Sequence, residues 1–195
     1  MTDADQKAVF VRYLDSAREG LLWKLEGLSD YDIRRPLTRT GTNLLGIVKH
    51  VAMVESGYLG SCLGRPVPDP LPHFDEAEAN SDMWAGADES RDFTVDFYHR
   101  VAQNSAATVQ ALGLDARGDV PWWPAERRHP TLQELLVRMV GETNRHAGHA
   151  DIVRESIDGA AGLRPGMTNL PDEGEGWWAN YRARLEEVAG GFKRS

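Results

Sequence analysis

The stretch that decides the fold is residues 131–159, TLQELLVRMVGETNRHAGHADIVRESIDG. Apolar residues recur in it every three or four positions, which is the spacing of one face of an α-helix. Thr131 and Glu134 form a capping-box pattern at its start, and Gly159 is a typical residue just past a helix end. The stretch therefore predicts one long helix that begins after Thr131 and stops at Gly159.

Working outward, three other segments show helical periodicity. They are residues 4–28, the segment from Leu44 to the proline-rich loop GRPVPDPLP, and residues 89–112. Thr2 or Asp3 is the expected N-cap of the first helix and Thr42 that of the second. WWANYRARLEEVAG near the C-terminus predicts a short fifth helix, and no segment alternates as a strand does. We therefore expect an all-α protein: a four-helix bundle with long connecting loops and a short C-terminal helix, forming a single domain over 1–195.

Composition narrows the classes of partner. The formal net charge is -8, which disfavours binding to nucleic acids and to anionic membranes. No apolar run is long enough for a membrane span, and the N-terminal residues do not form a secretory signal. The single cysteine, Cys62, gives no internal disulfide. We expect a cytoplasmic protein that acts on small molecules.

Polar residues interrupt the apolar face of the long helix at 131–159. An α-helix turns about 100° per residue. If Glu142 is the origin, His146 falls at roughly 40° and His149 at roughly -20°, close to the angles of Leu135 and Val153. All three polar side chains are therefore expected on the face that meets the bundle core.

Three polar side chains on an apolar face need compensation, because an unpaired buried carboxylate costs several kcal/mol. A divalent cation provides it, since imidazole and carboxylate groups are ordinary ligands. The alternative from spacing alone is a Glu–His hydrogen-bonded network that fixes helix register. A third metal ligand must come from another helix, where His50 lies at the edge of an apolar stripe and His99 lies away from one. His73 and His129 lie in loops and are expected to be exposed.

The pattern resembles the DinB-like superfamily of four-helix bundles. In that family one histidine from the second helix and two residues of a late helix, usually His-x-x-x-His followed by Gly-Gln, hold a metal. GIVKHVAMVE matches the first element through His50, and ETNRHAGH matches the second. The resemblance implies a metal bound by His50, Glu142 and His146, with Glu142 in place of the first family histidine. His149 takes the glutamine position, so the resemblance leaves open whether Glu142 or His149 completes the ligand set.

A narrower resemblance covers the chain from the first helix to about residue 163. RHAGHADIVRESIDGAAG, preceded by TLQELLVRMVGET, is similar to the actinobacterial branch regarded as mycothiol S-transferases, which are related to mycothiol-dependent maleylpyruvate isomerases. It implies a thiol transferase in which the metal, zinc first and nickel, iron or manganese as alternatives, activates mycothiol for attack on an electrophile. His149 is the expected catalytic residue that orients a ligand or carries a proton. A homodimer is one expected assembly.

Other assignments stay open at this point. A thiol-dependent isomerase, a metal-assisted hydrolase and a non-catalytic metal-binding bundle are the alternative functions. Arg145 and Arg154 flank the cluster and are the candidates for binding the cofactor, against a solvated helix face. The pairs Trp122-Trp123 and Trp177-Trp178 either line a pocket or close the ends of the bundle. The acidic segment 75–89 is a candidate wall of such a pocket, and Cys62 is expected to be structural.

Overall fold

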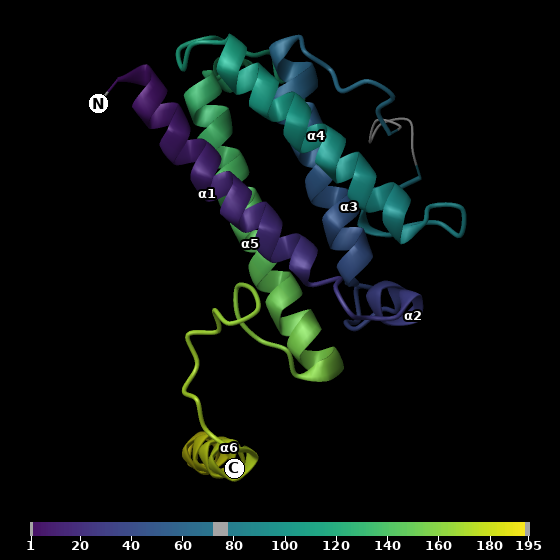
Figure 1. Ribbon diagram of the computed structural model, residues 1–195, viewed down its shortest axis with the longest axis vertical. Coiled ribbons are helices and arrows are strands. Elements are labelled where there is room, and N and C mark those ends of the chain that lie inside the picture. The colour runs from purple at the N-terminus through teal and green to yellow at the C-terminus, as the bar shows by residue number, and fades with distance from the viewer. Residues whose placement is uncertain (1, 72–77, 194–195) are drawn as a thin grey trace.

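The structure, a computed structural model, describes residues 2–71 and 78–193 (Figure 1). This part of the chain is helical and forms no sheet, which confirms the all-α prediction. The α-helices are α1 (Asp3–Trp23), α2 (Asp30–Arg34), α3 (Leu44–Glu55), α4 (Arg91–Ala111), α5 (Leu132–Asp158) and α6 (Glu175–Gly190). Among the described residues, no helix has both the length and the apolar character needed to cross a membrane.

The four long helices form the predicted bundle, in a packing consistent with the DinB-like type. α1 lies along α5, and α3 lies along α4 and also contacts α5 (Figure 1). The core between them is built from aliphatic side chains of every long helix, among them Leu21, Val51, Val101 and Met139. Burial of each such side chain contributes roughly 1.5–3 kcal/mol, so the packed faces rather than isolated helix propensity hold the bundle together.

Local capping sets most helix ends. Both halves of the Thr131–Glu134 capping box are present, and Gly159 ends α5 in the left-handed region at φ 77°. α3, however, is capped by Asn43 and not by the predicted Thr42: the Asn43 side chain accepts the Gly46 N–H. The Asn43 amide also donates to the carbonyl of Met83, a tertiary contact that the local sequence does not reveal.

α3 changes its winding where it approaches the loops. Its α-helical part ends at Glu55 and continues as a π-helix, η1 (Ser56–Gly60), and a 3₁₀ turn, η2 (Ser61–Leu63). The first predicted helix is also shorter than 4–28, because α1 ends at Trp23 and a turn follows that includes Gly27 at φ 74°. Short π-helical segments inside α-helices occur frequently at functional sites.

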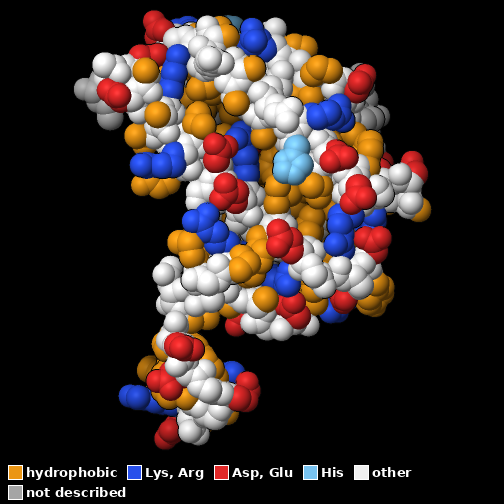
Figure 2. Space-filling model, in the orientation of Figure 1, with side chains coloured by type: hydrophobic (Ala, Val, Ile, Leu, Met, Phe, Trp, Pro, Cys, Tyr) orange, Lys and Arg blue, Asp and Glu red, His pale blue; other side chains and the backbone are white. Residues whose placement is uncertain are grey.

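The C-terminal helix is longer than the short one predicted. α6 contains 16 residues, buries none of them and lies apart from the bundle (Figure 1). The space-filling view shows acidic and basic side chains intermixed over the visible face of the bundle and of α6 (Figure 2). The single domain over 1–195 stays a prediction.

Candidate metal centre

Three predicted ligands meet between α3 and α5. His50 on α3 and Glu142 and His146 on α5 each offer one ligand atom, and these atoms all lie within 4.8 Å of one another. Glu142 Oε1 is 3.2 Å from His146 Nε2 and 3.6 Å from His50 Nε2. Two ligands of a tetrahedral zinc ion with bonds of 2.0–2.1 Å are about 3.3 Å apart. The donor set therefore fits a divalent metal in both chemistry and spacing.

The electrostatics of His146 also suit a metal ligand. Burial, followed by the neighbouring His50, lowers the pKa of His146, and Glu142 opposes this only in part. The neutral imidazole is the form that binds metal. The Nδ1 atom of His146 is buried without a hydrogen-bond partner, whereas its Nε2 atom faces Glu142. The ring is thus oriented with Nε2 toward the cluster.

The burial of α5 corrects one expectation. Its most buried positions include Leu132, Thr143 and Ala150, which centre the buried face roughly 80° away from Glu142 on the helical wheel. Glu142 and His146 therefore lie at the edge of the core and are half-buried, while His149 is exposed. The placement of His149 on the core face was wrong, although its ring still packs edge-on against His146 at 5.2 Å.

A fourth residue joins the cluster from a distant loop. Asp82 Oδ2 lies 2.5 Å from Nδ1 of His50, and both side chains are largely buried, with exposed fractions of 13% and 17%. A carboxylate in this position accepts the Nδ1 proton, which leaves the Nε2 lone pair pointing at Glu142 and His146. This is the arrangement by which outer-shell carboxylates orient metal-binding histidines.

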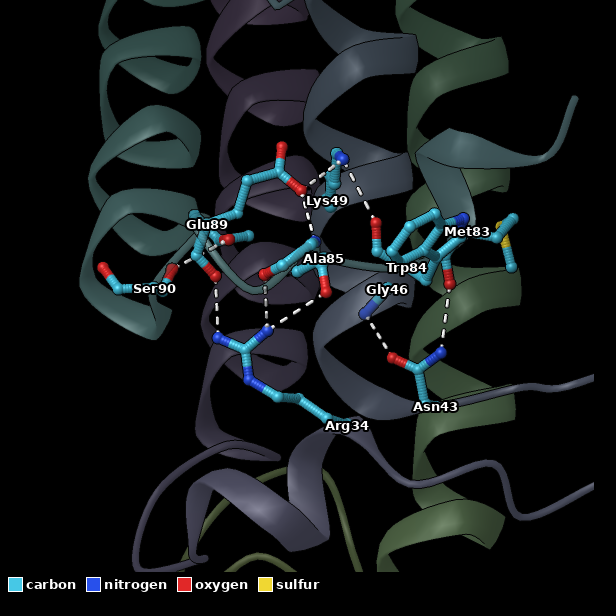
Figure 3. A network of polar contacts seen from close by, with 11 residues as sticks. Arg34, Asn43, Gly46, Lys49, Met83, Trp84, Ala85, Glu89 and Ser90 are labelled. Atoms are coloured by element: carbon cyan, nitrogen blue, oxygen red, sulfur yellow. Dashed lines mark hydrogen bonds and ion pairs between the residues drawn. The ribbon is translucent and has the colours of Figure 1, made fainter. Parts of the chain in front are cut away.

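The loop that carries Asp82 is fastened to α2 and α3 through its backbone (Figure 3). Asn43 donates to the carbonyl of Met83, and Lys49 donates to the carbonyl of Trp84 and pairs with Glu89 at 2.8 Å. Arg34 donates to three further carbonyls, those of Ala85, Gly86 and Glu89. We call this set of contacts from Asn43, Lys49 and Arg34 the loop clamp. It holds residues 82–89 of the acidic segment against α3.

Gly46 makes the loop clamp sterically possible. A Cβ atom at this position would lie 1.8 Å from the Met83 carbonyl oxygen and 2.5 Å from its carbon. Any side chain would therefore displace the loop backbone next to Asp82. The part of the predicted acidic wall at residues 75–77 lies outside the described residues, as does His73.

A cavity of about 370 Å³ opens beside the cluster. His50 and Glu142 line it, and its walls are mostly apolar, from Met53, Val54, Leu71, Phe97 and other residues. The π-helix contributes Ser56, Gly57 and Tyr58, so the change of winding in α3 coincides with the cavity. Trp122 also lines the cavity, whereas on α6 Trp177 stacks on Tyr181 and Trp178 packs edge-on against it.

The remaining predicted residues lie outside this centre. Arg154 is buried near the C-terminal end of α5. There it pairs with Asp158 and donates to the carbonyls of Trp23, Lys24 and Glu26. It ties the end of α1 to α5 and does not line the cavity. Arg145 is exposed on α5, and its role in binding a cofactor stays a prediction.

Two histidines that the sequence pattern placed away from the apolar faces or in loops lie outside the cluster. His99 and His129 are exposed, as expected. Cys62 is buried, and burial raises the pKa of its thiol to about 11, which makes it a poor nucleophile.

Two residues of the site were missed from the sequence. Arg138 lines the cavity one helical turn before Glu142, and its wheel angle of roughly -40° was a usable signal. Asp82 had no such signal, because its place depends on how a loop far from His50 in sequence folds back.

These observations define a class of protein: an all-helical bundle with a candidate His/Glu/His metal site beside an apolar cavity. The chain belongs to the mycothiol-S-transferase family, whose model matches residues 9–159. That range contains all three candidate ligands, and α6 lies beyond it. A comparison with curated proteins gives no match.

Proposed function

We propose that the protein is a divalent-metal-dependent S-transferase that joins mycothiol to a small electrophile. The observation that carries the proposal is the meeting of His50, Glu142 and His146 beside a cavity in a chain of the mycothiol-S-transferase family. Zinc is the proposed metal, because two imidazoles and one carboxylate leave the fourth tetrahedral position for a reactant, as in catalytic zinc sites. Nickel, iron and manganese suit the same donors.

The reaction is a transfer at sulfur. The thiol loses its proton, the sulfur forms a bond to the electrophilic carbon, and a leaving group departs with the electron pair of the broken bond. A divalent cation bound here would supply a lowered pKa for the thiol, so that the nucleophilic thiolate is present at neutral pH.

The protein residues supply orientation and exclusion of water. Asp82 fixes the tautomer of His50, and Glu142 lies between the two imidazoles. The apolar walls of the cavity keep the electrophile in contact with the cluster and limit competing attack by water. His149, exposed beside His146, is the proposed carrier of the thiol proton to solvent.

The test combines metal content with transfer activity. Four proteins are purified identically: wild type, His50→Ala, His146→Ala and His129→Ala. His129→Ala is the control, because His129 is exposed and lies outside the cluster. Metal is measured by mass spectrometry, and mycothiol conjugation to 1-chloro-2,4-dinitrobenzene is followed by absorbance. We expect both cluster variants to lose metal and activity and the control to keep both. Unchanged metal content in both cluster variants would refute the site.

The same experiment separates the alternatives. Turnover of an ester or amide without added thiol would indicate a metal-assisted hydrolase, and rearrangement without a stable conjugate would indicate a thiol-dependent isomerase. Metal binding without turnover of any probe would leave a non-catalytic metal-binding bundle. Homodimerisation and cytoplasmic location do not enter the proposal and stay predictions from sequence.

A further inference from the structure

Among the described residues that line the cavity beside His50 and Glu142, one is an arginine, Arg138. Arg138 lies on α5, four residues before Glu142, so that Arg138, Glu142 and His146 form one row along the helix. Its guanidinium carbon is 4.7 Å from the centre of the Tyr58 ring and 5.3 Å from that of the Trp123 ring. The cation is therefore held in place by stacking on aromatic faces.

This cation has no carboxylate partner. Among the described residues, no Asp or Glu oxygen lies within ion-pair distance of Arg138, although Arg18, Arg128 and Arg154 elsewhere in the protein each have such a partner. The guanidinium group is planar and holds its N–H donors in a fixed arrangement, which can bind a carboxylate through two parallel hydrogen bonds. Arg138 is an exposed residue, so both solvent and an entering anionic ligand can reach these donors.

The aromatic residues around Arg138 form a rigid wall. Tyr58 comes from the π-helix, and its hydroxyl oxygen accepts the indole N–H groups of Trp122 and Trp123 at 3.2 and 3.1 Å. These bonds orient both indole rings, and Trp122 lines the cavity together with Met53, Val54 and Phe97. The lining of the cavity thus combines a cation, apolar and aromatic side chains, and two residues of the candidate metal centre.

We propose that Arg138 binds a carboxylate of the electrophile, so that the substrates of the enzyme are anionic electrophiles with a flat apolar body. This inference rests on the proposed function for the identity of the reacting centre. The carboxylate pairs with Arg138, the body lies against the aromatic wall, and the electrophilic carbon faces His50 and Glu142. A stacked arginine that only covers the tryptophans from water would show no preference for acids.

The test measures binding and needs no turnover. Four acids (benzoate, cinnamate, phenylacetate and 2-naphthoate) and their methyl esters are titrated against the metal-loaded protein by tryptophan fluorescence and calorimetry. The proteins are wild type, Arg138→Gln, Arg138→Lys and the control Arg12→Gln, which removes the same charge from an exposed position outside the cavity. Circular dichroism verifies that each variant is folded.

We expect at least one acid to bind wild type tenfold or more tightly than its ester. Arg138→Gln should remove this preference and leave ester affinity within twofold, Arg138→Lys should retain part of it, and Arg12→Gln should retain all of it. No acid preference in wild type would overturn the proposal. A preference that persists in Arg138→Gln would also overturn it, because the carboxylate would then bind elsewhere, such as at the metal.

A second arm tests whether mycothiol occupies the Arg138 site in place of the acid. The acid titration is repeated with saturating mycothiol, and we expect the acid affinity to stay within threefold. Mutual exclusion of acid and mycothiol would assign Arg138 to the thiol and overturn its assignment to the electrophile. Because these readouts are binding constants, they remain decisive even if the protein proves to lack transferase activity.

Discussion

Replacing Gly46 with alanine is expected to weaken metal binding, although Gly46 is not one of the proposed ligands. The new Cβ would lie 1.8 Å from the Met83 carbonyl oxygen, against the 3.4–4 Å of ordinary contact. The loop backbone must therefore retreat by more than an ångström. Asp82 precedes Met83 and contacts His50 at 2.5 Å, so this retreat breaks its hydrogen bond.

The size of the effect follows from the role of Asp82. Loss of an outer-shell partner of a metal-binding histidine typically lowers metal affinity by about 10–100-fold, which is about 1.4–2.7 kcal/mol. Asp82→Asn removes the carboxylate directly and should fall in the same range. Gly46→Ala and Asp82→Asn remove the same contact between Asp82 and His50. Their effects on metal affinity should therefore not add in the variant that carries both.

The assay is competition for zinc between the metal-free protein and a chromophoric chelator at constant pH. Thermal unfolding followed by circular dichroism reports whether each variant folds. Gly176→Ala is the matched control, because Gly176 is also helical but an added Cβ meets nothing within 4 Å. A folded Gly46→Ala protein with wild-type zinc affinity would refute the reasoning, and so would fully additive effects of the two substitutions.

Two further predictions concern the interior. Glu55 is fully buried and pairs with Arg18, so Glu55→Ala should lower the free energy of unfolding in urea by about 3 kcal/mol, because it leaves the buried guanidinium of Arg18 with the half-exposed Asp15 as its remaining partner. The double change Arg18→Met and Glu55→Met should recover much of that loss, and a cost below about 1 kcal/mol for the single change would contradict this view. Cys62, with its pKa raised to about 11, should react with iodoacetamide at pH 8 roughly 100-fold more slowly in the folded protein than in urea, as measured by mass spectrometry; equal rates would show that the thiol is accessible and ionised.

Local signals in the sequence predicted the elements of the bundle and two ligands on one helix. The Thr131–Glu134 capping box and Gly159 are local features, and the structure contains both. Glu142 and His146 are one turn apart, so their meeting needs only that α5 be helical. His149 was misplaced because helical periodicity gives the angles between residues but not the rotation of the helix toward its neighbours.

Contacts made by loops were beyond what the sequence could predict. Asp82 reaches His50 only because the loop clamp holds its segment against α3, and that segment contains a single 3₁₀ turn, Ser81–Met83, which is too short to show a periodicity. The sequence pattern predicted Thr42 as the N-cap of α3 instead of Asn43, since both residue types are common N-caps. The tertiary contact that Asn43 makes with the Met83 carbonyl could not be read from the local sequence. Residues that depend on one backbone approaching another are the ones that sequence spacing does not reveal.

The row formed by Arg138, Glu142 and His146 has a consequence for the length of the ligands that the cavity would select. Successive members of the row are separated by one helical turn, about 5–6 Å between Cβ atoms, on a single rigid helix. If Arg138 binds a carboxylate as proposed, the row would favour a ligand whose charge and reacting carbon are separated by the matching distance over a shorter one. Selectivity would then change in whole-turn increments, by relocating the positive charge along α5 while the catalytic chemistry stays in place.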